Sequence, residues 1–216
     1  MRAAQDTLFA EDAARRSSGF APAPCSAFRC VVADPPWQID MEGGSDARTE
    51  VKRGKWSDPR QDNSKVKALA YPQMTVEEIA ALKVPAAEDA HLYVWTVNKY
   101  IEATYDIARA WGFEPSALLT WIKQPMGLGL GGTFCSNTEF ILFCRRGKLT
   151  AKRKVDTRWW GWPRGKHSEK PEAFQTLVES VSPGPYLEMF ARRKRPGWQS
   201  WGNELANDVE LTPNNH

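Results

Sequence analysis

The sequence predicts an α/β fold in which one sheet carries helices on both faces. Five short runs rich in β-branched, aromatic or leucine residues have the length of strands, and helical patterns lie between several of them. The 216 residues fit one domain, because two domains would each be near the lower end of the usual size range. We expect a mobile N-terminal arm over residues 1–24, a single domain over 25–206 and a flexible tail over 207–216.

The predicted strands cover residues 28–33, 91–95, 117–122, 139–144 and 186–190. The first helix is predicted at "TVEEIAAL", because Thr75 stands three residues before Glu78 as in a capping box. "NKYIEATYDIARAWGF" repeats apolar residues at helical spacing and ends at Gly112. "KPEAFQTLVESVSPG" has proline in its first turn and ends at Ser-Pro-Gly.

Several function classes are unsupported by the composition. No apolar run approaches the length of a membrane span, and the charged first residues do not resemble a signal peptide, so we expect a cytoplasmic protein that does not engage a membrane. Four cysteines without a CxxC pair and three histidines do not assemble a zinc-type constellation. We therefore predict free thiols and no metal.

The charge is unevenly distributed along the chain. Residues 145–170 contain ten basic and two acidic residues and carry +8, so the rest of the +3 chain sums to −5. A basic segment on an acidic body favours an anionic partner, of which nucleic acid is the commonest, although a solvated loop without a partner is an equal alternative on charge alone.

The stretch "CVVADPPWQID" places an acid, two prolines and a tryptophan at the end of the first predicted strand. Prolines end a strand and stiffen the turn, and the residue before a proline is held extended, so Asp34 has a fixed direction. Ligand sites in α/β sheets lie at the carboxyl ends of strands. The long polar stretch at 41–70 follows directly, and such loops are usually functional or disordered.

This turn suits chemistry on the amino group of a nucleobase. The lone pair of that nitrogen is delocalised into the ring, and acceptors for both of its hydrogens would localise it. Asp34 offers a carboxylate and Pro35 a carbonyl, while Pro36 keeps the carbonyl aimed and Trp37 offers a flat surface to a base. The predicted catalysis is positioning plus electrostatics.

On "ADPPW", "YPQMTVEEIAAL", "NTEFILFCRRG", "HSEKPEAFQTLVESVSPG" and "YLEMFARRKRPGWQSWGNEL", in that order, the chain resembles the MT-A-seventy family of S-adenosylmethionine-dependent adenine-N6 methyltransferases. The resemblance covers roughly residues 28–205. It implies a Rossmann-like, mostly parallel methyltransferase sheet with a permuted motif order, the catalytic loop first and the cofactor strand last. The chain departs from the family at Ala191, where glycine is usual, and at Glu204, where an amide is common.

The resemblance also implies the roles of individual residues. The catalytic residues are Asp34, Pro35, Pro36 and Trp37. The cofactor-binding residues for S-adenosylmethionine are Asp34, Lys170, Phe190, Arg192, Asn203 and Glu204. The substrate residues are Tyr71, Glu139 and Lys170. The structural alternatives are an edge-facing acid at Glu139, a solvated helix start at Lys170 and a Gly-Asn turn at Asn203. Lys123 ends a predicted strand at this edge but is not expected as a contact.

The segment "RWWGWPRGKHSEK" interleaves tryptophans with cations, as a surface that attracts phosphates and stacks on unpaired bases would. We predict that residues 158–170 form a second wall of the site opposite 41–70, with Arg158, Arg164 and Lys166 as further substrate contacts. At least one of the three tryptophans is expected in the core.

The predicted function is adenine-N6 methylation of nucleic acid. DNA is favoured over RNA, because the chain is short, lacks an RNA-binding appendage and has no long disordered tails. The alternatives are cytosine-N4 methylation, which needs the same two acceptors, and an inactive nucleic-acid-binding module of the same fold.

Overall fold

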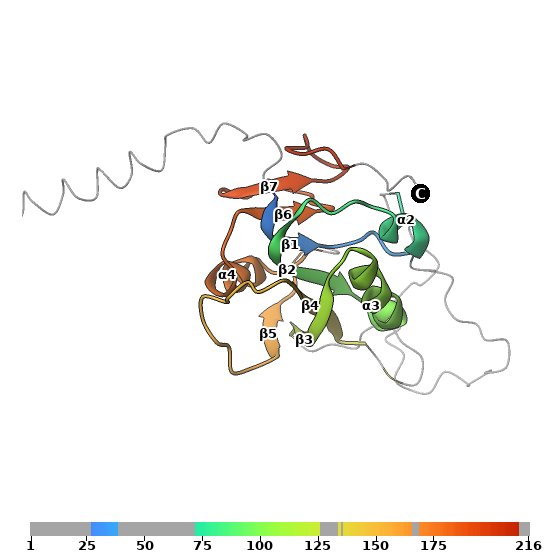
Figure 1. Cartoon of the computed structure of the whole chain (residues 1–216). Coiled ribbons are helices and arrows are strands. Elements are labelled where there is room, and N and C mark those ends of the chain that lie inside the picture. The colour runs from blue at the N-terminus through green and yellow to red at the C-terminus, as the bar shows by residue number, and fades with distance from the viewer. Residues whose placement is uncertain (1–26, 39–71, 126–133, 135, 166–168, 212–216) are drawn as a thin grey trace, which may run out of the picture.

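A computed structural model describes residues 27–38, 72–125, 134, 136–165 and 169–211 (Figure 1). The strands are β1 (Phe28–Ala33), β2 (Ala86–Thr96), β3 (Glu114–Gln124), β4 (Thr138–Arg146), β5 (Trp159–Pro163), β6 (Tyr186–Met189) and β7 (Trp198–Trp201). The helices are α2 (Val76–Ala80), the 3-10 turn η1 (Asn98–Tyr100), α3 (Ile101–Ala110) and α4 (Glu172–Val181).

The seven strands form one sheet in the order β5-β3-β4-β2-β1-β6-β7. Only β4 runs against its neighbours, since it pairs antiparallel with β2 and β3 while the other four pairs are parallel. The predicted mostly parallel sheet is confirmed. The carboxyl ends of six strands and the amino end of β4 therefore lie along one edge, where ligands bind in open α/β sheets.

The interior strand β1 is buried on both faces, which is why its sequence is almost continuously apolar. Val31 and Ala33 belong to the core on the side of α2 and α3, whereas Cys30 and Val32 belong to the core on the other side. Successive side chains of a strand point to opposite faces, so one strand supplies both cores. Figure 1 shows α3 and α4 on opposite sides of the sheet, as predicted.

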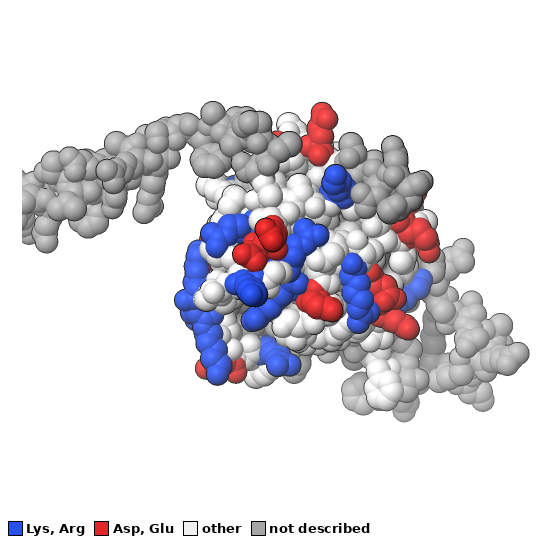
Figure 2. Space-filling model, viewed as in Figure 1, with Lys and Arg blue, Asp and Glu red and all other residues white. Residues whose placement is uncertain are grey.

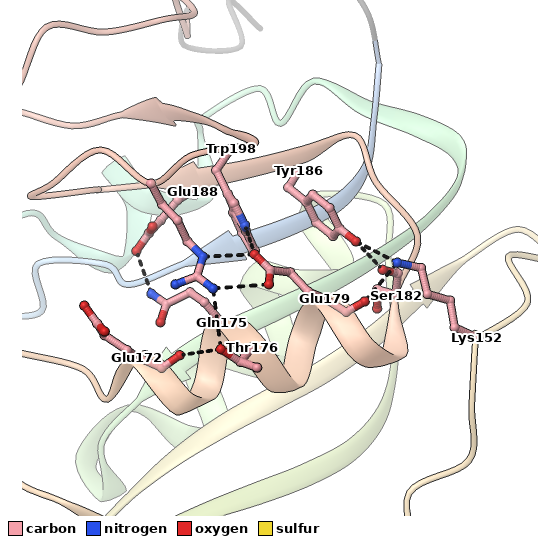
Figure 3. Close-up of polar contacts among 10 residues, drawn as sticks. Lys152, Glu172, Gln175, Thr176, Glu179, Ser182, Tyr186, Glu188 and Trp198 are labelled. Atoms are coloured by element: carbon pink, nitrogen blue, oxygen red, sulfur yellow. Dashed lines mark hydrogen bonds and ion pairs between the residues drawn. The ribbon is translucent and has the colours of Figure 1, made fainter. Parts of the chain in front are cut away.

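Helix α4 is attached to the sheet by apolar and polar contacts. Its own Phe174 and Val178 are fully buried against the sheet. On its flank the Glu179 carboxylate accepts from Arg195 Nε at 2.9 Å and from Trp198 Nε1 at 2.7 Å (Figure 3). Because Arg195 and Trp198 lie before and at the start of β7, these bonds hold the helix against the end of the sheet.

The helices begin and end close to the predicted positions. The Thr75 and Glu78 capping box is present, with Glu78 N–H donating to Thr75 Oγ1 at 3.1 Å and Thr75 N–H to the Glu78 carboxylate at 2.8 Å. β5 and β7 are edge strands of five and four residues, and neither was predicted from the sequence. β2 and β3 are also longer than predicted, at 11 residues each, because both carry charged or proline residues at their amino ends.

The predicted arm at 1–24 and most of the loop at 41–70 lie outside the described residues. Beyond β7 the chain turns back on the sheet, since Asn207 Oδ1 accepts from Gly202 N–H at 2.7 Å and Asp208 Oδ2 accepts from Ser200 N–H at 2.9 Å. The domain limits remain a prediction.

Cys30 and Cys144 are buried free thiols, while Cys25 and Cys135 lie outside the described residues. Among the helices that the structure describes, none is long and apolar enough to cross a membrane.

Candidate active site

The turn after β1 is held by main-chain hydrogen bonds on both sides. Asp34 N–H donates to the carbonyl of Met189 in β6 at 3.3 Å, and Met74 N–H donates to the Pro36 carbonyl at 3.0 Å. The Pro35 carbonyl accepts from Trp37 N–H at 2.9 Å. Because a carbonyl oxygen has two lone pairs, Pro35 keeps one acceptor position for a ligand.

Trp37 anchors this turn, and its environment differs from the sequence expectation of a surface for a base. Its side chain is 5% exposed and stacks on Tyr100, with ring centroids 4.9 Å apart and planes 14° from parallel. Trp37 Nε1 donates to the Trp95 carbonyl at 3.1 Å, and the Tyr100 hydroxyl donates to the Gln38 carbonyl. Burial against Tyr100 therefore gives Trp37 a positioning role in this structure.

Four charged side chains form a chain of alternating sign along the site edge. Lys170 Nζ lies 2.9 Å from Asp34 Oδ1 and 3.4 Å from Glu139 Oε2. Lys123 Nζ lies 2.6 Å from the other oxygen of Glu139. We call these residues the edge cluster. Their side chains are only 14% to 24% exposed, so the charges interact with little screening by solvent.

Within the edge cluster, Glu139 and Lys170 keep their charged forms despite burial. Burial alone would raise the pKa of Glu139, but the ammonium groups of Lys170 and Lys123 outweigh it and hold that pKa below its ordinary value. Burial alone would lower the pKa of Lys170, but the carboxylates of Asp34 and Glu139 hold it above its ordinary value. Lys170 Nζ also lies 5.2 Å from the centre of the Trp95 ring.

A pocket beside the edge cluster connects the ends of β1, β6 and β7. Its lining residues are Asp34, Pro36, Pro72, Phe190, Ala191, Arg192, Asn203 and Glu204. Arg192 Nε lies 3.7 Å from Glu204 Oε1, which bridges the two loops. Five of the six predicted cofactor residues therefore share this pocket, and the sixth, Lys170, contacts Asp34.

Two backbone features shape this pocket. Phe190 has φ +62°, a left-handed conformation that is uncommon for a bulky residue and that concentrates at functional sites. Gly202 packs against the neighbouring loop so closely that a Cβ there would lie 2.1 Å from the Ala191 carbonyl oxygen. The loop after β7 therefore requires glycine at this position to approach the loop after β6.

The basic segment places one arginine at each end of β5. Arg164 follows the strand at the site edge, where its N–H donates to the Gln124 carbonyl at 2.9 Å. Arg158 precedes the strand and lies away from that edge. Lys166 and Tyr71 lie outside the described residues, so their predicted contacts remain predictions, as does the pairing of this wall with residues 41–70.

The three tryptophans of the basic segment alternate along β5. Trp160 and Trp162 are partly buried and stack on each other at 5.4 Å, packed against the core on the α4 side. Trp159 is 61% exposed. The strand alternation explains this split, and tryptophan packing in the core was expected for at least one of them.

Two residues of the site were not assigned from the sequence. Lys123 was placed at the end of a predicted strand but was not expected as a contact, and it is a member of the edge cluster. Glu188 lies in β6, where burial raises the pKa of its carboxyl group and the nearby Asp34 carboxylate adds to the rise. A single glutamate inside an apolar strand gave no indication that it faces the charges of another loop.

A seven-stranded sheet with one reversed strand, and with charged and polar side chains gathered at the carboxyl edge, defines a Rossmann-like methyltransferase fold. The chain belongs to the MT-A70 family, which matches residues 28–204. Both sequence predictions, the fold and the family, are confirmed.

Several curated proteins are similar to the chain over most of its length. It is 29% identical over 195 residues to the type II methyltransferase M.MunI of Mycoplasma sp, covering 87% of this chain and 82% of that protein. It is 26% identical over 189 residues to a putative N(6)-adenosine-methyltransferase MT-A70-like protein of Medicago truncatula, covering 83% and 26%. It is 27% identical over 199 residues to the human N(6)-adenine-specific methyltransferase METTL4, covering 82% and 37%. The chain thus spans most of the first relative but about a quarter to about a third of the other two.

Proposed function

We propose that the chain transfers a methyl group from S-adenosylmethionine to the N6 amino group of adenine in DNA. The coarser prediction, an adenine-N6 methyltransferase that acts on nucleic acid, is confirmed by the family and by the names of its relatives. The identity of the methyl donor, the preference for DNA and the roles of individual residues are the proposal. The observation that carries it is the edge cluster beside the pocket of Asp34, Asn203 and Glu204.

The residues that line the pocket at the ends of β1, β6 and β7 have the chemistry that the proposed donor needs. A ribose presents hydroxyl groups, which the carboxylate of Glu204 and the amide of Asn203 can bind, and an adenine presents a flat ring, which Phe190 can contact. The close approach of Gly202 to Ala191 brings these two loops together. When bound, S-adenosylmethionine supplies an electrophilic methyl group on a sulfonium.

The protein residues act on the amino group of the substrate. Asp34 keeps acceptor capacity beyond its bond to Lys170, because a carboxylate offers about four lone-pair sites. It accepts one hydrogen of the adenine amine and the Pro35 carbonyl accepts the other, which directs the lone pair of the nitrogen toward the methyl group. The hydrogen bonds within the turn fix both acceptors before the substrate arrives, so little reorganisation is needed.

Lys170 and Glu139 hold this arrangement in place. Lys170 ties Asp34 to Glu139 and keeps the carboxylate of Asp34 directed along the site edge. Glu139 retains its charge because of its two lysine neighbours, so it can accept from a substrate donor throughout the neutral pH range.

DNA is proposed from the comparison of lengths and names. The relative whose length the chain matches most evenly is named a type II methyltransferase, whereas the relative named an adenosine methyltransferase is matched over about a quarter of its length. Human METTL4 is named for adenine, the base, rather than for adenosine, the ribonucleoside.

The test is transfer of a labelled methyl group to DNA and RNA oligonucleotides of matched sequence, single-stranded and double-stranded, followed by nucleoside analysis. We expect N6-methyladenine in DNA, and roughly 10³-fold slower transfer with an Asp34→Asn variant. N4-methylcytosine as the product, faster transfer to RNA, or no transfer despite cofactor binding would each replace the proposal with one of its alternatives.

A further inference from the structure

The two faces of the sheet are covered unequally. Helices α2 and α3 pack on one face, whereas α4 is the described helix on the other. The connection from β4 to β5, residues 147–158, contains no helix, and Figure 1 shows it as an irregular ribbon beside α4 and β5. Behind it lies a hollow of about 650 Å³. The volume is that of a small-ligand site rather than a packing defect.

The floor of this hollow is apolar and aromatic. It is formed by Leu119 of β3, Phe143 of β4 and Trp160 of β5, and α4 closes one side with Leu177 and Val181. Phe143 and Trp160 are partly buried, so their rings are part exposed within it. An aromatic floor suits a flat ring, because aromatic rings stack with nucleobases irrespective of sequence.

The wall of the hollow is fixed to the body of the protein. Lys152 N–H donates to the Val181 carbonyl at 2.7 Å, and Arg153 Nε donates to Ser180 Oγ at 3.0 Å. The buried His91 ring lies 2.8 Å from Ser182 Oγ and 3.2 Å from the Leu149 carbonyl oxygen. These bonds tie residues 149–153 to the end of α4, so the hollow exists before any ligand binds.

The rim of the hollow is basic. Its charged residues are Arg145, Lys148, Arg153, Lys154 and Arg158, and no described acidic residue lines it. All five are exposed. Figure 2 shows Lys and Arg gathered over the region where α4 and the β4–β5 connection lie. An apolar floor within a cationic rim is complementary to a base attached to its phosphates.

We propose that this hollow binds an unpaired base of the nucleic-acid substrate that flanks the target adenine, with its phosphates on the rim. The inference rests on the proposed function, in that the substrate is nucleic acid and its target adenine lies at the edge cluster. Leu119 and Lys123 are four residues apart on β3, which places the nearest part of the floor roughly 13 Å from the edge cluster. Phe143 lies farther along the sheet, since it pairs with Ala117. At ~3.4 Å per stacked nucleotide the flanking base is about four nucleotides from the target.

The test measures binding of labelled single-stranded oligonucleotides to the full chain by fluorescence anisotropy, using a trinucleotide and an eleven-nucleotide strand that are both centred on one adenine. The rim variant carries Arg145→Ala and Lys154→Ala. A filling variant, Ala151→Phe, adds a ring at a lining position without changing charge. The matched control, Lys83→Ala with Arg109→Ala, removes two exposed cations near α2 and α3.

The rim variant should bind the long strand about tenfold more weakly, with the salt dependence reduced by about 0.7 per lost phosphate contact, and should bind the trinucleotide as the unaltered chain does. The filling variant should also weaken binding of the long strand, but with an unchanged salt slope. An abasic site about four nucleotides from the adenine, on one side only, should weaken binding to the unaltered chain and have no further effect on the filling variant.

The inference is overturned if both variants bind the long strand normally, or if the control pair weakens binding as much as the rim pair. It is also overturned if the variants change only the oligomeric state, which would make the hollow a protein interface. Absence of methyl transfer to these strands, with the binding pattern intact, would refute the proposed function and leave the hollow assigned.

Discussion

The edge cluster and the Glu179–Arg195 pair on α4 are both groups of opposite charges, but they differ in how completely they are enclosed by partners. At the α4 pair, Glu179 receives two bonds from Arg195 at 2.9 and 3.1 Å and one from Trp198, so its acceptor positions are largely filled (Figure 3). At the edge cluster, Lys170 divides its bonds between Asp34 and Glu139, and Asp34 borders an open pocket.

The difference indicates which group is built for stability and which for chemistry. A bidentate arginine pair with filled acceptors fixes a helix and leaves nothing for a ligand. A lysine shared by two mostly buried carboxylates stabilises the fold less than its close contacts suggest. The free energy of removing these charges from water offsets much of their mutual attraction. Such a group persists at the end of a strand when a ligand uses it.

The largest effect should follow from Asp34→Asn at the edge cluster. The amide removes the negative charge that accepts from the substrate amine, so methyl transfer should fall by roughly 10³-fold, while cofactor affinity stays within about tenfold. Single-turnover methyl transfer and calorimetry measure the two quantities. Near-normal turnover would mean that Asp34 is not the acceptor.

Lys170→Met should lower methyl transfer by roughly 10²-fold and lower the free energy of unfolding at pH 7 by about 3 kcal/mol, because it leaves two carboxylates without their shared cation. Lys170 helps to hold the pKa of Glu139 below its ordinary value, so the stability that this pairing supplies is present above the ordinary glutamate pKa of about 4.3, and the deficit should shrink as the pH falls through the lower pKa of the folded state. Chemical denaturation at several pH values measures it. A deficit that is constant with pH would show that Lys170 contributes packing rather than charge. Lys123 still neutralises Glu139 in this variant.

The sequence predicted those parts of this cluster that depend on local rules. Asp34 was predicted because an acid before two prolines at the end of an apolar strand is fixed in direction, and Glu139 and Lys170 followed from the family resemblance. The ion pair of Lys123 with Glu139 was not predicted, because it depends on the pairing of β3 with β4, which brings Trp121 opposite Glu139. The stacking of Trp37 could not be predicted from local sequence, because its partner, Tyr100, lies 63 positions away in the chain.

In the fold, too, the parts that depend on local sequence rules were predictable. Long strands and capped helices carry local signals, and these elements were found close to their observed positions. The edge strands β5 and β7 are short, and their pairing with β3 and β6 is non-local. The connection between β4 and β5 contains no helix, which leaves the hollow on the α4 side. Apart from the density of charged residues, no local sequence pattern predicted this.

Asn203→Ala should weaken binding of S-adenosylmethionine by roughly 1–3 kcal/mol, because it leaves a ribose hydroxyl without its partner. Isothermal titration calorimetry measures this directly, with Asn207→Ala as a control, since Asn207 bonds to Gly202 rather than lining the pocket. Unchanged affinity would make Asn203 a turn residue and would leave Glu204 as the proposed ribose ligand.

The smallest effect should follow from Glu179→Gln at the α4 pair. Hydrogen bonds from Arg195, more than any other interaction, lower the pKa of Glu179, so the folded state favours the charged form. Its contribution is present above the ordinary glutamate pKa of about 4.3 and is lost as the pH falls through the lower pKa of the folded state. With 34% of the side chain exposed, solvent screening limits the loss on substitution to about 1 kcal/mol at pH 7. Denaturant titrations should show this loss at pH 7 and a difference that shrinks as the pH falls through the lowered pKa of Glu179, with the methyl-transfer rate unchanged at both ends of the neutral range. A large fall in that rate would show that the α4 pair also serves the site, and the distinction between the two clusters would fail.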